Sequence, residues 1–217
     1  RSRASLTAMN VADAMRYSLL GLSQSPRIRR TLETSPVSRG VVARYVPGTE
    51  VTDAVSAAEG LKESRRLVTV DFLGEDTTRL EQAQLTRDAY LSLLGGLAEA
   101  NLVQGGAAEV SIKLSALGQS LPHDGDAIAL EYAREVCEAA ARCGTTVTVD
   151  MEDHTTTDRT LEAITELRVD YPWVGAVVQS YLRRTEADCR DLAVAGSRVR
   201  LCKGAYKEPE SVAFQSK

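Results

Sequence analysis

The chain has 217 residues, of which 43% are hydrophobic and 26% are charged, and its formal net charge is −4. This composition is typical of a folded globular protein, and it excludes a mainly disordered chain, which would combine low hydropathy with high net charge. The longest stretch without Lys, Arg, Asp or Glu is Tyr171–Leu182. A membrane-spanning helix needs about 20 apolar residues, so this sequence does not predict one.

Positive charge is concentrated at the start of the chain. Residues 1–44 hold eight Arg and two acidic residues, a balance of +6 that leaves −10 for the rest. A solvated helical arm, a transit peptide and an arm that binds nucleic acid all fit such a segment. Nucleic-acid surfaces interleave basic with aromatic residues, and Tyr17 is the one aromatic residue here. We therefore expect a basic helical N-terminal arm over residues 1–40 that does not bind nucleic acid.

The four cysteines show no metal-binding or disulfide pattern. Cys137, Cys143, Cys189 and Cys202 include no Cys-x-x-Cys pair, and neither histidine lies near one in sequence. We expect no zinc site, no disulfide scaffold and a reducing compartment.

From about residue 41, short β-rich runs alternate with helical segments. The predicted strands are Val41–Val46, Leu67–Leu73, Val110–Leu114, Thr146–Met151, Gly175–Tyr181 and Val199–Ala205. The predicted helices are Glu50–Ser64, Asp76–Ala100, Asp126–Arg142, Thr157–Val169 and Thr185–Val194. The strand runs are nearly continuously apolar, which favours parallel strands covered on both faces.

This alternation predicts a parallel α/β fold, either an open doubly wound sheet or a (β/α)₈ TIM-type barrel. The sequence contains neither the dinucleotide motif G-x-G-x-x-G nor the phosphate loop G-x-x-x-x-G-K-[ST]. We therefore expect a barrel with about six of its eight β/α units present over residues 41–217. In such a barrel the chemistry lies at the carboxyl ends of the strands.

Each predicted strand from the second to the sixth brings a polar side chain to its carboxyl end: Asp71, Lys113, Asp150, Gln179, Arg200 and Lys203. A lysine inside an apolar strand is costly unless it has a partner, so we expect Lys113 to pair with Asp150 on the neighbouring strand. Such a pair could orient a zwitterionic or anionic ligand. Arg200 and Lys203 predict an electropositive floor under an anion or an electron-rich ring.

One alternative site uses the acids after the fourth strand. Asp150 and Glu152 share one face of their strand because side chains alternate, and His154 follows them. These three residues would suit a metal-dependent aldolase or lyase. Only one other histidine is present, however, so we expect no metal site.

Six ordered segments match one family. They are Arg44–Gly48, Asp71–Glu75, Ser111–Gly118, Val149–Asp153, Val178–Leu182 and Arg200–Tyr206. In this order and spacing the sequence resembles the proline dehydrogenases, FAD-dependent (β/α)₈ barrels. Lys207-Glu208-Pro209 after Tyr206 is similar to the monofunctional bacterial enzymes.

The resemblance implies oxidation of L-proline to Δ1-pyrroline-5-carboxylate with FAD, the first step of proline catabolism, and electron transfer to a quinone. It implies a catalytic role for Arg200, beside the flavin N5 and O4, and for Lys113 with Asp150. Lys113 and Tyr206 would bind the substrate. The residues implied in cofactor binding are Gln179, Arg200, Lys203, Gly204 and Ala205.

The resemblance also implies a bacterial cytoplasmic protein in peripheral contact with the membrane, or a mitochondrial one in a eukaryote. The family's paired arginines that hold the proline carboxylate follow the eighth strand, and the sequence ends at Lys217. We therefore expect a C-terminally incomplete chain with weak activity or none. The start at Arg1 and not at Met also predicts a fragment or a processed product. Cys202 stands where the family usually has an aliphatic residue.

Overall fold

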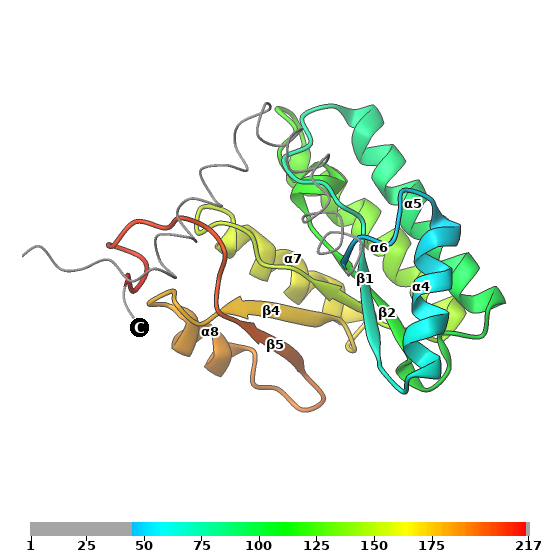
Figure 1. The fold of residues 1–217 in the computed structure, drawn as a ribbon. Helices are drawn as coiled ribbons and strands as arrows, with labels where there is room; N and C mark the ends of the chain where they lie inside the picture. Colours follow the sequence, from blue (N-terminus) through cyan, green and yellow to red (C-terminus); the bar gives the residue numbers. More distant parts are fainter. Residues whose placement is uncertain (1–44, 216–217) are drawn as a thin grey trace, which may run out of the picture. The chain divides into compact units, whose positions relative to one another are not determined.

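The computed structural model describes residues 45–215 (Figure 1). Of these, residues 50–215 belong to one compact unit. The predicted arm, residues 1–40, lies outside the described residues. The strands of the unit are β1 (Val68–Asp71), β2 (Ala108–Ile112), β3 (Val147–Val149), β4 (Gly175–Gln179) and β5 (Arg198–Cys202). The α-helices are α4 (Val51–Glu63), α5 (Leu80–Glu99), α6 (Gly125–Cys143), α7 (Thr157–Asp170) and α8 (Thr185–Asp191).

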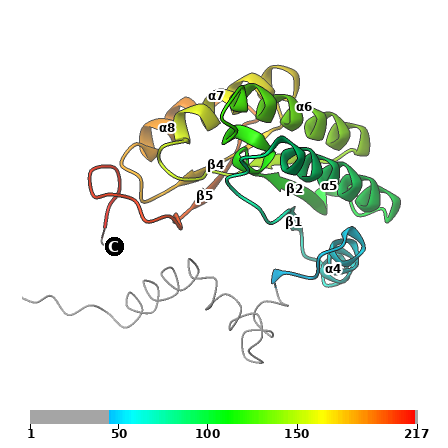
Figure 2. The ribbon, with the colours of Figure 1, turned by 90° about the horizontal axis from the view of Figure 1, so that it is seen from above.

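Within the described residues the five strands form one parallel sheet in the order β1-β2-β3-β4-β5. Each strand pairs with its neighbour in the chain; Val68, for example, lies opposite Ala108. A doubly wound sheet reverses its strand order at a switch point, and this sheet does not. Helices α5, α6, α7 and α8 cover the same face of the curled sheet (Figure 2). The predicted barrel-type α/β fold is therefore confirmed.

The first predicted strand, Val41–Val46, lies mostly outside the described residues. Residues 41–44 lie outside the described residues, and Tyr45 and Val46 do not belong to a strand. The described chain therefore supplies five barrel strands where six were expected.

Strands β2, β3 and β4 are buried at nearly every position, as expected of parallel strands covered on both faces, but the two faces of the sheet differ in polarity. Side chains alternate between the faces of a strand. On β2, Val110 and Ile112 are fully buried in the core beneath the helices. Glu109 and Ser111, at the alternate positions, make hydrogen bonds across the opposite, inner face. The sequence did not predict this polar inner face, because the strands are short and contain threonines, so polar and apolar residues do not alternate clearly.

Glu109 joins four strands at the base of the inner face. It accepts hydrogen bonds from Thr69 on β1 (3.1 Å) and from Thr146 beside β3 (2.7 Å), and it forms an ion pair with Arg198 on β5. Burial opposes the charge of Glu109, but the hydrogen bonds of Thr146 and Arg198 and the charge of Arg198 outweigh it. The pKa of Glu109 is therefore lower than its ordinary value.

Replacing Glu109 with glutamine should lower the free energy of unfolding at pH 7 by about 1–2 kcal/mol, because the partly exposed Arg198 loses a charged acceptor. A lowered folded-state pKa stabilises the protein above the unfolded pKa of about 4.3, and this contribution is lost as pH falls through the folded value. Urea unfolding at pH 7 and at stepwise lower pH measures the effect. The difference between wild type and Glu109→Gln should shrink with falling pH, and a constant difference would contradict it.

Two predicted boundaries shift near the strand ends. Helix α5 begins at Leu80 and not at Asp76, because the backbone N–H of Asp76 and of Thr77 bond to Ser115 instead. Strand β2 ends at Ile112, so Lys113 lies just beyond it and leads into the helical turn η2 (Ser115–Gln119). Helix α6 ends at Cys143, and Gly144, which caps it, has a φ of +75°.

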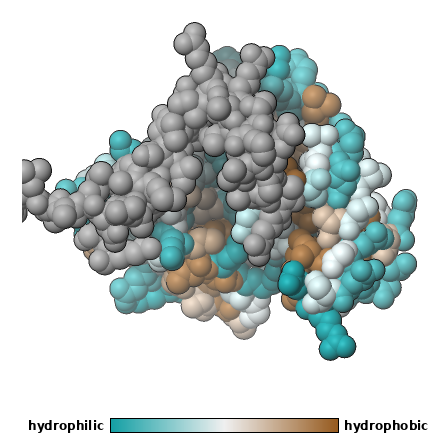
Figure 3. Space-filling view, in the orientation of Figure 1, coloured by the Kyte–Doolittle hydropathy of each residue, from teal (hydrophilic) through white to brown (hydrophobic). Residues whose placement is uncertain are grey.

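No helix in residues 45–215 is long and apolar enough to cross a membrane. Hydrophobic surface is visible over β5 in Figure 3, and Val199 and Leu201 on that strand are exposed.

Candidate active site

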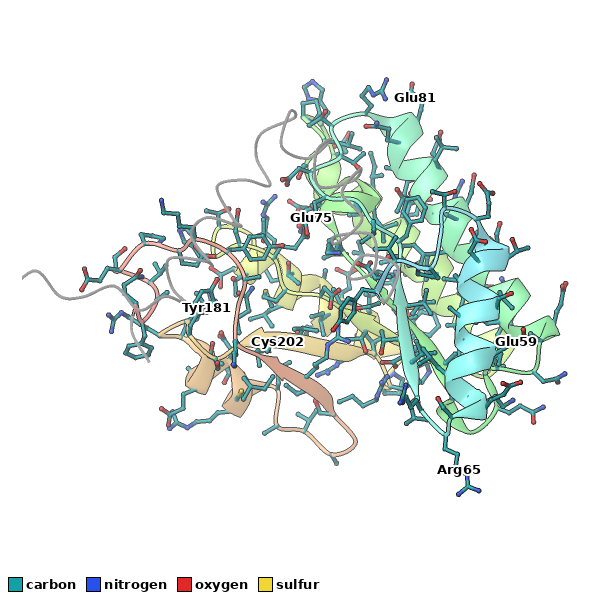
Figure 4. All side chains as sticks on the ribbon, viewed as in Figure 1. Glu59, Arg65, Glu75, Glu81, Tyr181 and Cys202 are labelled. Atoms are coloured by element: carbon teal, nitrogen blue, oxygen red, sulfur yellow. The ribbon has the colours of Figure 1, made fainter. Side chains whose placement is uncertain are left out.

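Polar side chains from four strands meet at the carboxyl edge of the sheet, because parallel strands end on the same side. Asp71 is the last residue of β1, Lys113 and Asp150 directly follow β2 and β3, and Arg200 lies within β5. Figure 4 shows Tyr181 and Cys202 beside the ends of β4 and β5. The expectation that the strand ends gather the polar residues is therefore confirmed.

Arg200 is held on the inner face by two partners. Its Nη2 donates to Ser111 Oγ at 2.9 Å and forms an ion pair with Asp150. Its Nε is buried and has no hydrogen-bond partner within the described part of the chain. A buried donor without a partner costs free energy that a bound acceptor would recover. The guanidinium therefore has an unused donor at the edge of the sheet.

Lys113 pairs with Asp71 and not with Asp150, so the ion pair expected from the sequence is wrong. Lys113 Nζ lies 2.5 Å from Asp71 Oδ2 and 4.0 Å from Glu75 Oε1. The sheet is curled and the Arg200 side chain is long, so its guanidinium reaches Asp150, just after β3. Lys113 therefore pairs with Asp71. Burial opposes the ammonium charge, but the hydrogen bond and charge of Asp71 outweigh it and raise the pKa of Lys113. Lys113 is therefore a cation at neutral pH.

Gln179, the last residue of β4, has an unused acceptor. Its side chain is almost fully buried, and its Nε2 donates to the backbone oxygens of Met151 (3.2 Å) and Glu152 (2.6 Å). These bonds fix the orientation of the amide. Its Oε1 is buried and, among residues 45–215, no group donates to it.

The residues proposed for a metal site each have a different partner. Asp150 pairs with Arg200, while the buried Glu152 accepts hydrogen bonds from the backbone N–H (3.1 Å) and hydroxyl of Ser115. Burial raises the pKa of Glu152. His154 Nδ1 contacts the buried carboxylate of Glu208. No group of three His, Cys, Asp or Glu side chains in the described ranges is arranged to hold a metal ion.

The segment after β5 folds back over the strand ends. Gly204 has φ of +99°, and a Cβ built there would lie 2.1 Å from the Tyr181 ring. Tyr181 donates its hydroxyl to Tyr206 O at 3.2 Å, and Tyr206 donates to Glu75 Oε1 at 3.3 Å. Burial first, and then the charge of Glu75, raise the pKa of Tyr206. Lys203 and Ala205 are exposed in the same segment.

Two site residues were not assigned a role from the sequence. Asp71 was seen at a strand end, but its pairing with Lys113 depends on how the sheet curls. Tyr90 lies among buried apolar residues of α5, yet its hydroxyl lies 2.9 Å from Asp71 Oδ1. The signal for Tyr90 was the hydroxyl itself, because a buried tyrosine usually finds a polar partner.

Known proteins are similar to this chain in sequence and in fold. A sequence model of the family described as "Proline dehydrogenase" matches residues 54–217. Proline dehydrogenase 1 of Bacillus subtilis is 30% identical over 94% of this chain and 65% of its own length. Proline dehydrogenase of Deinococcus radiodurans is 31% identical over 93% of this chain and 64% of its own.

A solved structure shows the same architecture. Proline utilization A (PutA) from Bdellovibrio bacteriovorus, inactivated by N-propargylglycine, aligns with a TM-score of 0.67 and 27% identity over 78% of this chain and 20% of that protein. The chain spans about 65% of the length of the first curated relative. Because the family model matches most of the residues of this chain, the chain belongs to the proline dehydrogenase family.

Proposed function

We propose that the protein is a flavoenzyme that oxidises L-proline to Δ1-pyrroline-5-carboxylate and passes the electrons to a quinone. The observation that carries the proposal is the pair of buried polar atoms, Gln179 Oε1 and Arg200 Nε, that have no partner in the described residues. They are one acceptor at the end of β4 and one donor in the middle of the neighbouring strand β5. Membership of the proline dehydrogenase family supports the same activity.

These two atoms fit the polar edge of an isoalloxazine ring. Gln179 Oε1 would accept from the N–H of the flavin pyrimidine edge, while Arg200 would donate near N5 and O4 and stabilise negative charge there. Bound FAD supplies the acceptor for a hydride from the proline carbon next to nitrogen. Lys203, Gly204 and Ala205 would support the cofactor, and the glycine lets the backbone approach closely.

The remaining residues would position the substrate. The Lys113 ammonium would attract the proline carboxylate, and Tyr206 would pack against the proline ring. Asp150 would orient Arg200 through their ion pair. Little side-chain acid–base chemistry is needed if proline binds as the free amine. We also propose that the protein is bacterial and cytoplasmic and that it contacts the membrane peripherally, where its quinone acceptor is located.

The test uses the protein expressed from its whole gene. We expect the purified protein to carry FAD, and anaerobic L-proline to bleach the visible flavin band and yield a product that reacts with aminobenzaldehyde. L-Valine, which lacks the ring, should leave the band unchanged. A flavin-free protein that fails to oxidise proline after incubation with FAD would refute the proposal. Dependence on a divalent ion without flavin would favour the aldolase or lyase alternative.

A further inference from the structure

A buried tyrosine in the helix layer reaches the ion pair at the strand ends. Tyr90 lies on α5 and is 0% exposed. Its hydroxyl is 2.9 Å from Asp71 Oδ1 and 2.7 Å from Ser111 O, and it accepts the N–H of Phe72 at 3.1 Å. The hydroxyl therefore joins the ends of β1 and β2 from behind the sheet.

The two oxygens of Asp71 face opposite layers. Oδ1 faces Tyr90 on the helix side, and Oδ2 binds Lys113 Nζ at 2.5 Å on the site side. Burial first, and then the charge of Asp71, raise the pKa of Tyr90 well above its ordinary value, so the hydroxyl keeps its proton. The hydroxyl has a single proton, which Asp71 Oδ1 and Ser111 O share, and its donation to the carboxylate fixes the rotation of that carboxylate about its Cβ–Cγ bond.

We propose that Tyr90 is a positioning residue that fixes the Asp71 carboxylate and thereby aims the Lys113 ammonium at the carboxylate of the substrate. This inference rests on the proposed function for the role of Lys113. Loss of the Tyr90 hydroxyl allows the Asp71 carboxylate to rotate. The Lys113 ammonium, which is bound to Asp71, then changes its position as well. Tyr90 itself touches neither substrate nor cofactor, because its ring lies in the core beneath the sheet.

The first measurement does not depend on activity. Lysine reactivity toward reductive methylation, followed by mass spectrometry, should rise about fivefold at Lys113 in Tyr90→Phe, because a hydrogen bond that holds its partner is lost. Lys62 on α4, whose Nζ donates to Asn101 O at 2.7 Å, serves as the internal reference. The matched control is Tyr132→Phe, since Tyr132 is a buried tyrosine on α6 that packs against Arg87. Unchanged Lys113 reactivity in Tyr90→Phe would overturn the proposal.

The second measurement asks whether the substrate uses this arrangement. Tyr90→Phe should raise KM for proline about fivefold with kcat nearly unchanged, and it should have no such effect in a Lys113→Ala background. An equal rise of KM in both backgrounds, or no rise at all, would show that Tyr90 does not act on the substrate through Lys113. Higher Lys113 reactivity in a protein whose wild type does not oxidise proline would refute the proposed function and retain the link from Tyr90 to Lys113.

Discussion

Replacing Arg200 with alanine should slow the reduction of bound flavin by proline about 10²–10³-fold, the usual cost of removing one preorganised donor. The guanidinium is held by Asp150 and by Ser111 Oγ at 2.9 Å, so it needs no rearrangement before the reaction. Its Nε is buried without a partner in residues 45–215, which leaves it free to donate to a bound ring. Anaerobic stopped-flow absorbance measures the rate, and flavin content is measured alongside.

The matched control for Arg200 is Arg198, two residues earlier on the same inner face of β5. Arg198 pairs with Glu109 at the base of the sheet, away from the strand ends. Arg198→Ala should lower stability and leave the rate of flavin reduction within about twofold of wild type, because Arg198 is paired with Glu109 away from the strand ends. Arg200→Lys keeps the charge but loses the planar donor, so we expect partial activity. Equal rates for Arg200→Ala and wild type would remove Arg200 from the site.

Replacing Gly204 with alanine should lower the free energy of unfolding by about 2–4 kcal/mol, as the sum of backbone strain and overpacking. The residue has φ of +99°, and a new Cβ would lie 2.1 Å from the Tyr181 ring. Displacing that ring would break its 3.2 Å hydrogen bond to Tyr206 O. We therefore expect the variant to retain less flavin as well. Urea unfolding and the flavin-to-protein ratio measure the two effects.

A glycine without these constraints is the control for Gly204. Gly60 lies inside α4, is exposed, and has no atom within 4 Å of a built Cβ. Gly60→Ala should stabilise the protein by about 0.5–1 kcal/mol through helix propensity. If Gly204→Ala proved as stable as wild type and kept its flavin, the close approach between Gly204 and Tyr181 would have no role in holding the segment after β5.

Helix positions and fold class could be predicted because they depend on local signals. The end of α6 at Gly144 follows from a glycine that adopts positive φ at low cost. The alternation of strands and helices implied parallel strands, and the polar residue at each strand end implied a common edge. Lys113 and Arg200 were therefore placed at the site edge correctly from sequence, although their roles remain predictions.

The partners of those residues could not be predicted, because they depend on contacts between distant segments. Ser115 accepts a hydrogen bond from the backbone N–H of Asp76, so α5 begins later than predicted. Its own backbone N–H donates to Glu152, which follows β3. The periodicity of the sequence predicts neither contact. The pairing of His154 with Glu208 joins residues 54 positions apart.

The sequence by itself determined the order of elements, the parallel sheet and the set of charged residues at its carboxyl edge. Only the tertiary structure decided that Lys113 pairs with Asp71 and that Arg200 pairs with Asp150. It also decided that Tyr90 reaches Asp71 from the helix layer. The physical reason is that local propensity sets where each side chain leaves the backbone, whereas the curl of the sheet and the reach of each side chain set which charges meet.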